Sequence, residues 1–458
     1  MIHRFERANM YLALDTGSGA VHVLDKPAYA LLGIVTLKEL AQKELAAANE
    51  QALQQLYAEF GKQQVNTTFE ELCALFQEGL LYSDDSYSEF KEKLGDSPIK
   101  AMCLHMAHDC NLRCKYCFAS TGDFGGGRKL MPLETAKKSI DLLISLSKGR
   151  RNLEVDFFGG EPMMNYAVLC QTVEYARAIE KQEGKNFRFT VTTNGLSLND
   201  RNIEMINREM SNVVLSLDGR QSVNDKMRLK IDGSGSYDTI VPKFQKLVQG
   251  RGDKEYYVRG TYTRDNLDFD KDVLELYNLG FDQISVEPVV GPETDDYSIR
   301  PQDIAAIEQS YTRLMQEMAK RKRSRAGDFN FFHFMIDLDN GPCAIKRLKG
   351  CGSGNEYIAI TPDGEIYPCH QFVGKPEFIM GSVDAGITKP ELKKTFADAN
   401  LFSKPTCMEC WAKFFCSGGC NANNYAFNGS ILEPHKLSCE LEKIRLECAI
   451  AMQALLAQ

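Results

Sequence analysis

The stretch HDCNLRCKYCFAS, from His108 to Ser120, places three cysteines close together, at Cys110, Cys114 and Cys117. One loop with these spacings can direct three thiolates toward the same face of a metal centre. A structural zinc site would need a fourth ligand, for which Cys103 and His108 are the nominal candidates. A [4Fe-4S] cluster is normally held by four thiolates, so three cysteines would leave one iron open to another ligand. The stretch therefore predicts a metal site of one of these two kinds.

The segment around this stretch, residues 98–325, alternates between strand-like and amphipathic helical patterns. We expect strands at 99–107, 153–159, 187–194, 213–218, 256–263 and 283–290. Six β-α units in succession predict parallel strands with right-handed crossovers, in a doubly wound sheet or a partial barrel. Either architecture places its active site at the C-terminal ends of the strands. The three-cysteine stretch directly follows the first strand, so it lies where that site is expected.

Short polar motifs end the next three strands: GGEP the second, TTNG the third and SLDG the fourth. Glycines at strand ends let the backbone approach a ligand closely. In isolation each motif would be an ordinary turn or cap. The three motifs place the residues Gly159, Gly160, Glu161, Pro162, Asn194, Ser216 and Asp218 at the strand ends, and the basic side chain of Arg228 follows them.

The sequence CNLRCKYC resembles the CxxxCx(aromatic)C signature of radical S-adenosylmethionine (SAM) enzymes. The resemblance implies a (β/α)6 barrel in which the open iron binds the amino and carboxylate groups of SAM. It also implies that one electron from the cluster cleaves SAM to a radical that abstracts hydrogen from a substrate. By the same resemblance Tyr116 lies near the adenine, GGEP contacts the SAM amino group, and Ser216 and Asp218 face the ribose or carboxylate. Arg228 would then pair with a carboxylate.

Seven further cysteines lie near the C-terminus, at Cys351, Cys369, Cys407, Cys410, Cys416, Cys420 and Cys439. Two zinc sites are the generic interpretation of such spacings. The whole pattern, including Gly364, resembles the seven-cysteine motif of SPASM domains, which carry two auxiliary [4Fe-4S] clusters. That resemblance implies that Cys407, Cys410, Cys416 and Cys439 hold a distal cluster. Cys351, Cys369 and Cys420 would hold a nearer one, whose fourth ligand is Cys343 or a substrate cysteine.

Composition agrees with a multi-domain globular protein of 458 residues. The net charge of −8, with both signs interspersed, gives no reason to expect nucleic acid or a membrane surface as partner. Neither a membrane-spanning apolar run nor a signal peptide is evident, so we expect a cytoplasmic location. Fifteen cysteines there favour metal or redox chemistry over disulfides. We expect Cys73, Cys103, Cys170 and Cys448 to be small buried apolar residues.

Residues 1–90 form a separate unit in this interpretation. Strand-like runs at 4–15 and 19–32 precede helical patterns at 37–61 and 67–81, in which Thr68 would begin the second helix. This order resembles a small winged-helix module. Such a unit is either a scaffold extension or a sheet edge that receives a peptide strand. The predicted organisation is thus a recognition module at 1–90, a barrel at 98–325 and a cysteine-rich SPASM domain at 326–458.

Across nearly its whole length the chain is similar to the radical SAM maturases of SCIFF (six-cysteines-in-forty-five) peptides, of the CteB type. The resemblance implies three [4Fe-4S] clusters, SAM, a flavodoxin- or ferredoxin-type electron donor and a cysteine-rich ribosomal precursor bound through its leader. The implied reaction joins a cysteine sulfur to a carbon as a thioether. Sulfatase-maturing enzymes share the architecture but place an aspartate where this chain has His370, which weakens oxidation of Ser or Cys to formylglycine. A noncatalytic zinc protein is the remaining alternative.

Overall fold

The computed structural model describes residues 1–45, 49–84, 86–324, 327–336, 338 and 344–457. Cys343, the candidate extra ligand, lies outside the described residues. None of the helices in the described ranges combines the length and apolar character needed to cross a membrane.

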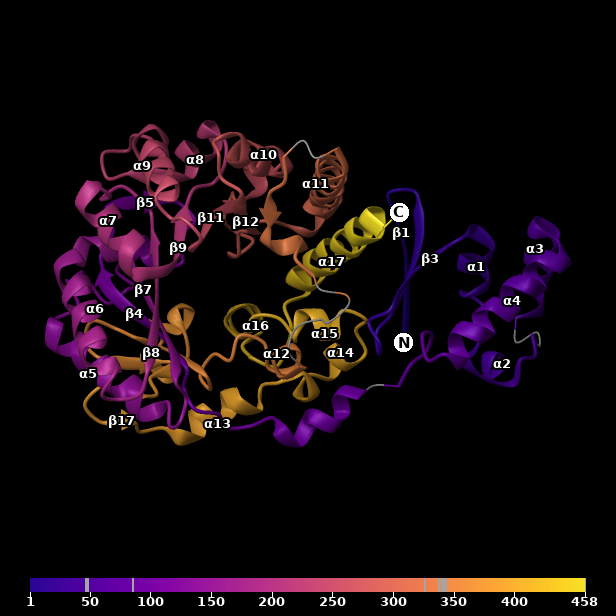
Figure 1. Cartoon of the computed structure of the whole chain (residues 1–458), viewed down its shortest axis with the longest axis horizontal. Coiled ribbons are helices and arrows are strands. Elements are labelled where there is room, and N and C mark those ends of the chain that lie inside the picture. The colour runs from indigo at the N-terminus through magenta and orange to yellow at the C-terminus, as the bar shows by residue number, and fades with distance from the viewer. Residues whose placement is uncertain (46–48, 85, 325–326, 337, 339–343, 458) are drawn as a thin grey trace.

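A central parallel sheet organises the largest part of the chain (Figure 1). Its six main strands are neighbours in the order of the sequence, and all pair in parallel. They are β4 (Ala101–His108), β7 (Asn152–Gly159), β8 (Asn186–Thr193), β9 (Met210–Ser216), β11 (Glu255–Tyr262) and β12 (Gln283–Pro288). The prediction of six parallel strands is confirmed. The two-residue strand β13 (Asn330–Phe331) pairs in parallel with β12 and extends the sheet, and β6 (Lys129–Leu130) pairs antiparallel with the end of β4.

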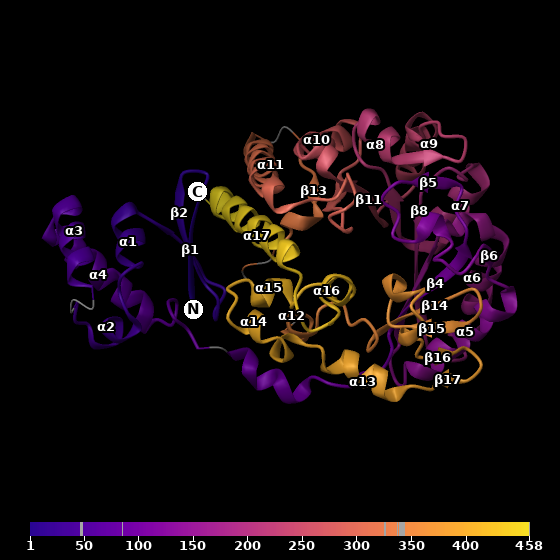
Figure 2. The same ribbon diagram turned by 180° about the vertical axis from the view of Figure 1, so that it is seen from behind.

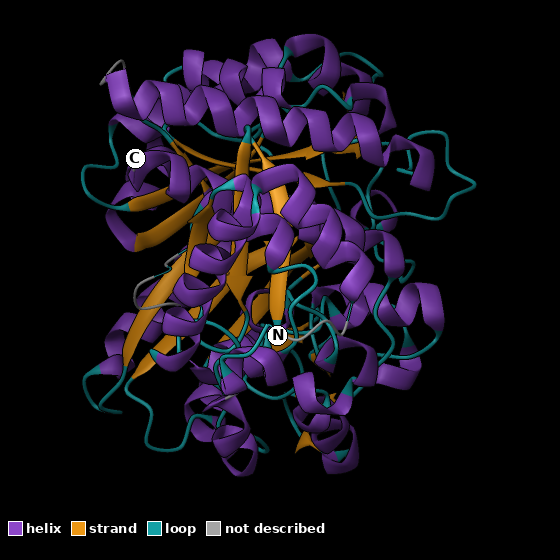
Figure 3. Ribbon diagram, turned by 90° about the vertical axis from the view of Figure 1, so that its right-hand side faces the viewer, coloured by secondary structure: helices purple, strands orange, loops and turns teal. Residues whose placement is uncertain are grey.

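Helices cover the outer face of this sheet (Figure 3). They are α5 (Leu133–Leu146), α6 (Tyr166–Glu180), α7 (Asp200–Glu209), α8 (Gln221–Met227), α9 (Tyr237–Gln249), α10 (Asp270–Asn278) and α11 (Ile304–Ser324). Their buried side chains recur every three or four residues, as in α5, where Ala136, Ile140 and Leu143 face the sheet core. Short 3-10 segments connect several elements, including η3 (Pro162–Asn165), η4 (Arg264–Asn266) and η6 (Phe332–Phe334).

The cysteine-rich region adds strands to the same sheet, which the sequence analysis did not expect. β14 (Tyr357–Ile360) pairs in parallel with β4 on the side opposite β7. β15 (Glu365–Tyr367), β16 (Gly381–Ser382) and β17 (Gly386–Ile387) continue it in antiparallel pairs. The run at β14 is only four residues long, so its pattern alone did not distinguish a strand from a loop. Its last three side chains are fully buried.

Helices make up the rest of that region. They are α12 (Ala344–Lys349), α13 (Pro390–Asp398), α14 (Pro405–Met408), α15 (Lys413–Cys416), α16 (Asn421–Asn428) and the long α17 (Lys436–Ala457). α17 lies between α11 and the N-terminal sheet in both opposed views (Figures 1 and 2). Three of the four isolated cysteines, Cys73, Cys103 and Cys448, are buried as predicted, whereas Cys170 is half-buried.

In its described residues, the N-terminal unit has a three-stranded antiparallel sheet and four helices. These elements are β1 (Ile2–Arg7), β2 (Met10–Asp15), β3 (Val21–Leu24), α1 (Lys26–Leu31), α2 (Leu37–Gln42), α3 (Glu50–Phe60) and α4 (Lys62–Gln77). The single run expected at 4–15 is a hairpin instead, because Ala8 and Asn9 take positive φ angles of 52° and 61° in a two-residue turn. The run at 19–32 ends as a helix, and Thr68 lies inside α4 rather than at its start.

Side chains of β1 attach this unit to the cysteine-rich region. The ring of His3 stacks on Trp411 with centroids 3.8 Å apart and planes 4° from parallel. His3 also contacts Glu447 of α17 at 3.0 Å. Arg7 forms ion pairs with the same Glu447 and with Glu308 of α11. Since Trp411 directly follows Cys410, the N-terminal sheet lies next to a predicted cluster ligand.

Candidate functional site

The three-cysteine loop is held from two sides at the C-terminal end of β4. Its middle forms a short strand, β5 (Leu112–Cys114), which pairs antiparallel with β10 (Arg228–Lys230) so that Cys114 faces Arg228. The Cys110 sulfur accepts from the Leu112 amide and from the Asn194 side chain, each at 3.4 Å. The loop is therefore fixed by the sheet end and by a strand pair that the sequence did not indicate.

The three thiols influence one another, which indicates that they lie close together. Burial raises the pKa of Cys110 to about 12, and Glu161, Cys114 and Cys117 add to the rise. Burial likewise raises the pKa of Cys114 to about 11, although Arg228 opposes the rise. A thiol with a raised pKa keeps its proton and is a poor metal ligand. Coordination by a metal cation removes the proton and produces the thiolate ligand. The donor set thus suits a cluster held by three thiolates.

The two other zinc-ligand candidates, His108 and Cys103, contact other side chains. His108 contacts His105, with 3.0 Å between His108 Nε2 and His105 Nδ1, and burial lowers the pKa of His108 to about 4. Cys103 is buried inside β4, where its thiol interacts with Tyr357 and Cys369. Among the described residues, no three His, Cys, Asp or Glu side chains are arranged around a single metal ion. His108 and Cys103 thus have contacts of their own and are not seen as a fourth ligand beside the three thiols in the described residues.

The glycines of GGEP allow the end of β7 to meet the cysteine loop directly. A Cβ at Gly160 would lie 2.2 Å from the Asp109 carbonyl oxygen, and one at Gly159, which has a φ of 117°, would lie 2.3 Å from that of Ala107. The amides of Gly160 and Glu161 donate to these carbonyls, of Ala107 and Asp109, at 2.8 and 2.9 Å. A side chain at either position would therefore collide with the backbone at Ala107 or Asp109, so both positions require glycine.

Glu161 lies between the ends of two strands. Its carboxylate accepts from Thr193 Oγ1 at 2.7 Å, from the Asn194 amide at 2.8 Å and from the Met163 amide at 3.1 Å. Burial raises the pKa of this carboxyl, although these donors oppose the rise. Pro162 begins η3 directly after it. The Glu161 side chain thus ties β7 to β8, while Asn194 turns its own side chain to Cys110 and Asn111.

Tyr116, Asp218 and Arg228 form a buried polar group beside Cys114. The Tyr116 hydroxyl donates to Asp218 at 2.5 Å and accepts from the Arg228 guanidinium at 2.9 Å. Asp218 also accepts from the Thr261 amide at 3.1 Å. Arg228 Nε is buried and has no hydrogen-bond partner among the described residues. A free buried donor with a fixed positive charge fits an anionic ligand such as the carboxylate of SAM.

Ser216 ends β9 opposite Arg259 of β11, and no side-chain hydrogen bond of Ser216 is seen in the described residues. It is half-buried. Ser216 therefore lies at the same sheet edge as the Tyr116–Asp218–Arg228 group without joining it.

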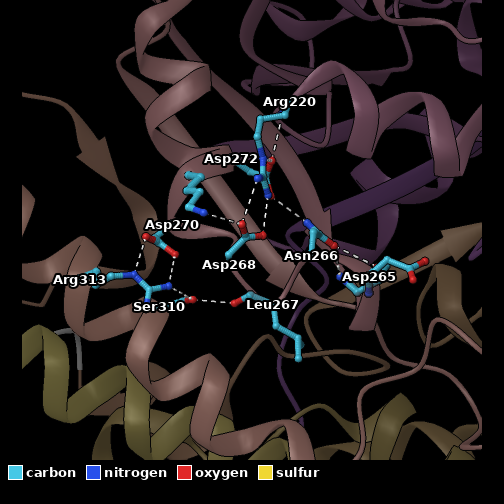
Figure 4. A network of polar contacts seen from close by, with 11 residues as sticks. Arg220, Asp265, Asn266, Leu267, Asp268, Asp270, Asp272, Ser310 and Arg313 are labelled. Carbon is cyan, nitrogen blue, oxygen red and sulfur yellow. Dashed lines mark hydrogen bonds and ion pairs between the residues drawn. The ribbon is translucent and has the colours of Figure 1, made fainter.

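A polar network holds the loop that carries Asp218 (Figure 4). Arg220, two residues later, binds Asp272 of α10 through Nε at 2.7 Å and Asp268 through Nη2 at 2.6 Å. Asp272 is fully buried and also accepts from Asn266 at 2.9 Å. At the other end of the network Arg313 binds Asp270 at 2.7 Å. The sequence did not single out Arg220, whose partners lie in α10 and just before it, some 50 residues downstream.

Electrostatic interactions connect the seven C-terminal cysteines in two sets. Cys407 interacts electrostatically with Cys410 and Cys439, and Cys416 with Cys407 and Cys439. Cys369 interacts instead with Cys351 and Cys420. The resemblance implies the same two sets as ligand sets, although no three of these side chains are arranged around a single metal ion in the described residues. A cavity of about 240 Å³ borders both sets, and its lining includes Cys416, Cys420, Cys439, Glu287, His435 and Arg445.

His370 faces charged groups of the barrel that the sequence did not identify. Burial lowers the pKa of His370 to about 4, and Arg259 lowers it further while Glu287 opposes the shift. Arg259 of β11 and Glu287 of β12 form an ion pair with each other. His333, 3.1 Å from Ser285 of β12, accepts from Arg445 of α17 at 2.7 Å. Arg259 and Glu287 are charged residues within otherwise apolar strands, and this feature of the sequence could have identified them.

Comparisons with known proteins fit this arrangement. The family described as "4Fe-4S single cluster domain" matches residues 100–241. The chain is 25% identical over 339 residues to a cysteine-type anaerobic sulfatase-maturating enzyme of Clostridium novyi, with 69% of this chain and 86% of the relative covered. It is 24% identical over 337 residues to the antilisterial bacteriocin subtilosin biosynthesis protein AlbA of Bacillus subtilis, covering 70% of this chain and 68% of AlbA.

Two solved structures have a similar fold. Native anSMEcpe with bound AdoMet and Cp18Cys peptide aligns with a TM-score of 0.64 at 17% identity, covering 79% of this chain and 98% of that one. Streptococcus suis SuiB bound to precursor peptide SuiA aligns with a TM-score of 0.52 at 16% identity, covering 94% and 97%. These matches show the α/β fold with a central parallel sheet. Together with the sequence relatives they support the resemblance to radical SAM/SPASM maturases.

Proposed function

We propose that this protein is a radical SAM maturase that forms thioether cross-links between cysteine sulfurs and carbon atoms of a ribosomal precursor peptide. The observation that carries the proposal is the division of ten cysteines into three groups, one of three thiols at the sheet end and two beyond it. A single-cluster enzyme would need only the first group. Two further groups beside the barrel suit an enzyme that must also hold a substrate sulfur and accept an electron.

Each group would hold one [4Fe-4S] cluster. Cys110, Cys114 and Cys117 would hold the SAM-binding cluster, with the Arg228 guanidinium available to the SAM carboxylate. When bound, SAM and its cluster supply hydrogen abstraction, and the auxiliary clusters offer an iron for a thiolate and a sink for an electron. The Tyr116 hydroxyl accepts a hydrogen bond from Arg228, and the Asp218 carboxylate lies 3.9 Å from the guanidinium. Both would orient Arg228, and the carboxylate favours its charged form.

The nearer auxiliary group has an opening toward substrate in this proposal. Cys351 and Cys420 are exposed in the described structure, whereas Cys369 is buried. Its fourth ligand would be Cys343 or a cysteine of the precursor. Coordination of a substrate cysteine would remove its proton and fix the position of the sulfur that forms the new bond.

The N-terminal unit is the proposed leader-binding module, with a winged-helix-like order of strands and helices. β3 is the last strand of its sheet in the described residues, so one edge is free to accept a peptide strand. Val23 on β3 is 49% exposed and offers an apolar contact to such a strand. The SuiB match supports this assignment, since it covers 94% of the chain whereas the anSMEcpe match covers 79%. A tethered core peptide would reach the barrel at a raised effective concentration.

Oxidation of a Ser or Cys side chain to formylglycine is the second candidate. The relative from C. novyi and the anSMEcpe structure favour it. Against it, the residue after Cys369 is His370, with a lowered pKa near 4, instead of an aspartate. A flavodoxin- or ferredoxin-type donor would supply electrons for either reaction.

Anaerobic reaction with a cysteine-rich peptide tests the proposal. The probe is the short cysteine-rich peptide encoded nearest to this gene, with its leader intact, and the readouts are peptide mass and a hydrazine trap for aldehydes. Thioether formation removes two hydrogens per bridge and leaves no aldehyde. An aldehyde product would favour the second candidate.

A further inference from the structure

A lysine is buried among the cysteines that form the two auxiliary groups. Lys404 directly precedes α14, which carries Cys407, and its side chain is 1% exposed. Its ammonium donates to the Gly418 carbonyl at 2.9 Å and to Asn421 Oδ1 at 3.1 Å. Gly418 belongs to the loop that contains Cys420, and Asn421 begins α16 directly after that loop.

The loop from Cys416 to Cys420 closes over this lysine. Gly418 has a φ of 85°, and a Cβ there would lie 2.7 Å from Lys404 Cδ. Cys416 belongs to the distal group and Cys420 to the nearer one, so the loop connects the two ligand sets. The ammonium therefore lies beneath the shortest covalent connection between the two proposed clusters.

Burial of an ammonium in this way is costly unless negative charge compensates it. Burial lowers the pKa of Lys404, and the thiols of Cys407, Cys416, Cys351 and Cys420 oppose that shift. Two of these thiols belong to each group. An ammonium also has three N–H donors, and the described residues accept two of them. One donor thus stays available for a thiolate or a cluster sulfide.

We propose that Lys404 provides a fixed positive charge shared by both auxiliary clusters, which makes both easier to reduce. Net charge and hydrogen bonds to sulfur are principal determinants of the reduction potential of an iron–sulfur cluster. A buried cation stabilises the more negative, reduced state of each cluster near it. The inference rests on the proposed function, because it requires two auxiliary clusters. It assigns to this lysine a role that neither the cysteine pattern nor the reaction specifies.

An anaerobic redox titration of the iron-loaded full chain, followed by electron paramagnetic resonance, measures the midpoint potential of each cluster. K404M and K404Q remove the charge, and K404Q keeps an N–H donor for the Gly418 carbonyl. We expect both auxiliary potentials to shift to more negative values in both variants. The potential of the SAM-binding cluster should stay unchanged. K404R should behave as wild type, and so should K394M, which removes an exposed lysine of α13 that is paired with Asp398.

Unchanged auxiliary potentials in K404Q, or a shift of only one of them, would overturn the shared-charge role. Loss of auxiliary iron from both neutral variants would also overturn it, since Lys404 would then be a structural residue. A wild-type protein that holds iron for one cluster only would overturn the proposed function itself. Iron and sulfide analysis of the wild type before the titration separates this last outcome from the others.

Discussion

The Tyr116 hydroxyl donates to the Asp218 carboxylate across 2.5 Å, which joins the cysteine loop to the end of β9. Asp218 is fully buried, and Arg228 lies on the other side of the same hydroxyl. The contact therefore places a carboxylate, a phenol and a guanidinium at one corner of the proposed SAM site. The charges of Asp218 and Arg228 interact strongly there, because burial leaves both groups little access to water.

D218A should destabilise the barrel, because it leaves Arg228 buried without its nearest carboxylate. Removal of one partner from a buried pair costs about 3–5 kcal/mol, and urea unfolding under anaerobic conditions measures the loss. D200A is the matched control, since Asp200 pairs with Lys246 but is 85% exposed, and it should leave the unfolding midpoint unchanged. Equal midpoints for D218A and wild type would show that the buried group contributes no stability.

The two ends of the network in Figure 4 should differ in their effect on SAM binding. R220M removes the cation beside fully buried Asp272, so stability should fall by about 3–5 kcal/mol. Since Arg220 follows Asp218 by two residues, the loop at the SAM site should also loosen and SAM affinity should fall. R313M removes the Arg313–Asp270 pair without touching that loop, so SAM affinity should stay at the wild-type value. Calorimetric titration of SAM into both variants decides the matter, and equal affinities would contradict the positioning role of Arg220.

His333 should make the protein less stable as pH falls. Burial and the adjacent Arg445 lower the pKa of His333 to about 3. An unfolded histidine has a pKa of about 6.5, so the unfolded state binds more protons between pH 6.5 and 3. Well above pH 6.5 both states hold a neutral imidazole, so His333 causes no pH-dependent loss of stability. At pH 5.5 it lowers the free energy of unfolding by about 1.4 kcal/mol.

H333Q should reduce the loss of unfolding free energy between pH 7.5 and 5.5 by about this amount, because glutamine does not titrate. Urea unfolding at both pH values measures the loss. S285A removes the hydroxyl contact at 3.1 Å but keeps the imidazole, so its pH dependence should match wild type. An unchanged pH dependence in H333Q would mean that other groups cause the acid sensitivity.

The cysteine groups should behave as separate metal sites. Three [4Fe-4S] clusters require about twelve irons per chain. C407S/C416S should lose about four irons and keep the signals of the other clusters, because both cysteines belong to the distal group. C369S/C420S is the matched variant of the nearer group. Zinc in place of iron in the anaerobically purified wild type would instead support a metal-stapled binding protein.

The sequence predicted the six parallel strands and the location of the cysteine loop, because apolar strand patterns and strand-end motifs are local. The extension of the sheet by β14 was missed, since Tyr357–Ile360 is too short for a periodic pattern and its partner Ala101 is more than 250 residues away. The hairpin turn was missed because its two residues, Ala8 and Asn9, do not match the usual Asn-Gly or Asp-Gly pair.

For the candidate site, too, the sequence predicted some features and missed others. Cysteine spacing predicted metal chemistry at both cysteine regions, whereas the assignment of individual cysteines to ligand sets came from the resemblance and stays a prediction. Arg220 and Lys404 could not be found in this way, because their roles depend on burial and on partners from other elements. The glycines of GGEP were predicted as ligand contacts, and the structure adds a second reason, their close approach to the carbonyls of Ala107 and Asp109.

The mass of a cysteine-rich precursor after anaerobic reaction with SAM and a reductant tests the central claim most directly. The account predicts a loss of two hydrogens for each thioether, together with 5′-deoxyadenosine, and no such loss in the C110A/C114A/C117A variant. Formation of 5′-deoxyadenosine with an unchanged peptide mass, or an aldehyde in the product, would contradict the account.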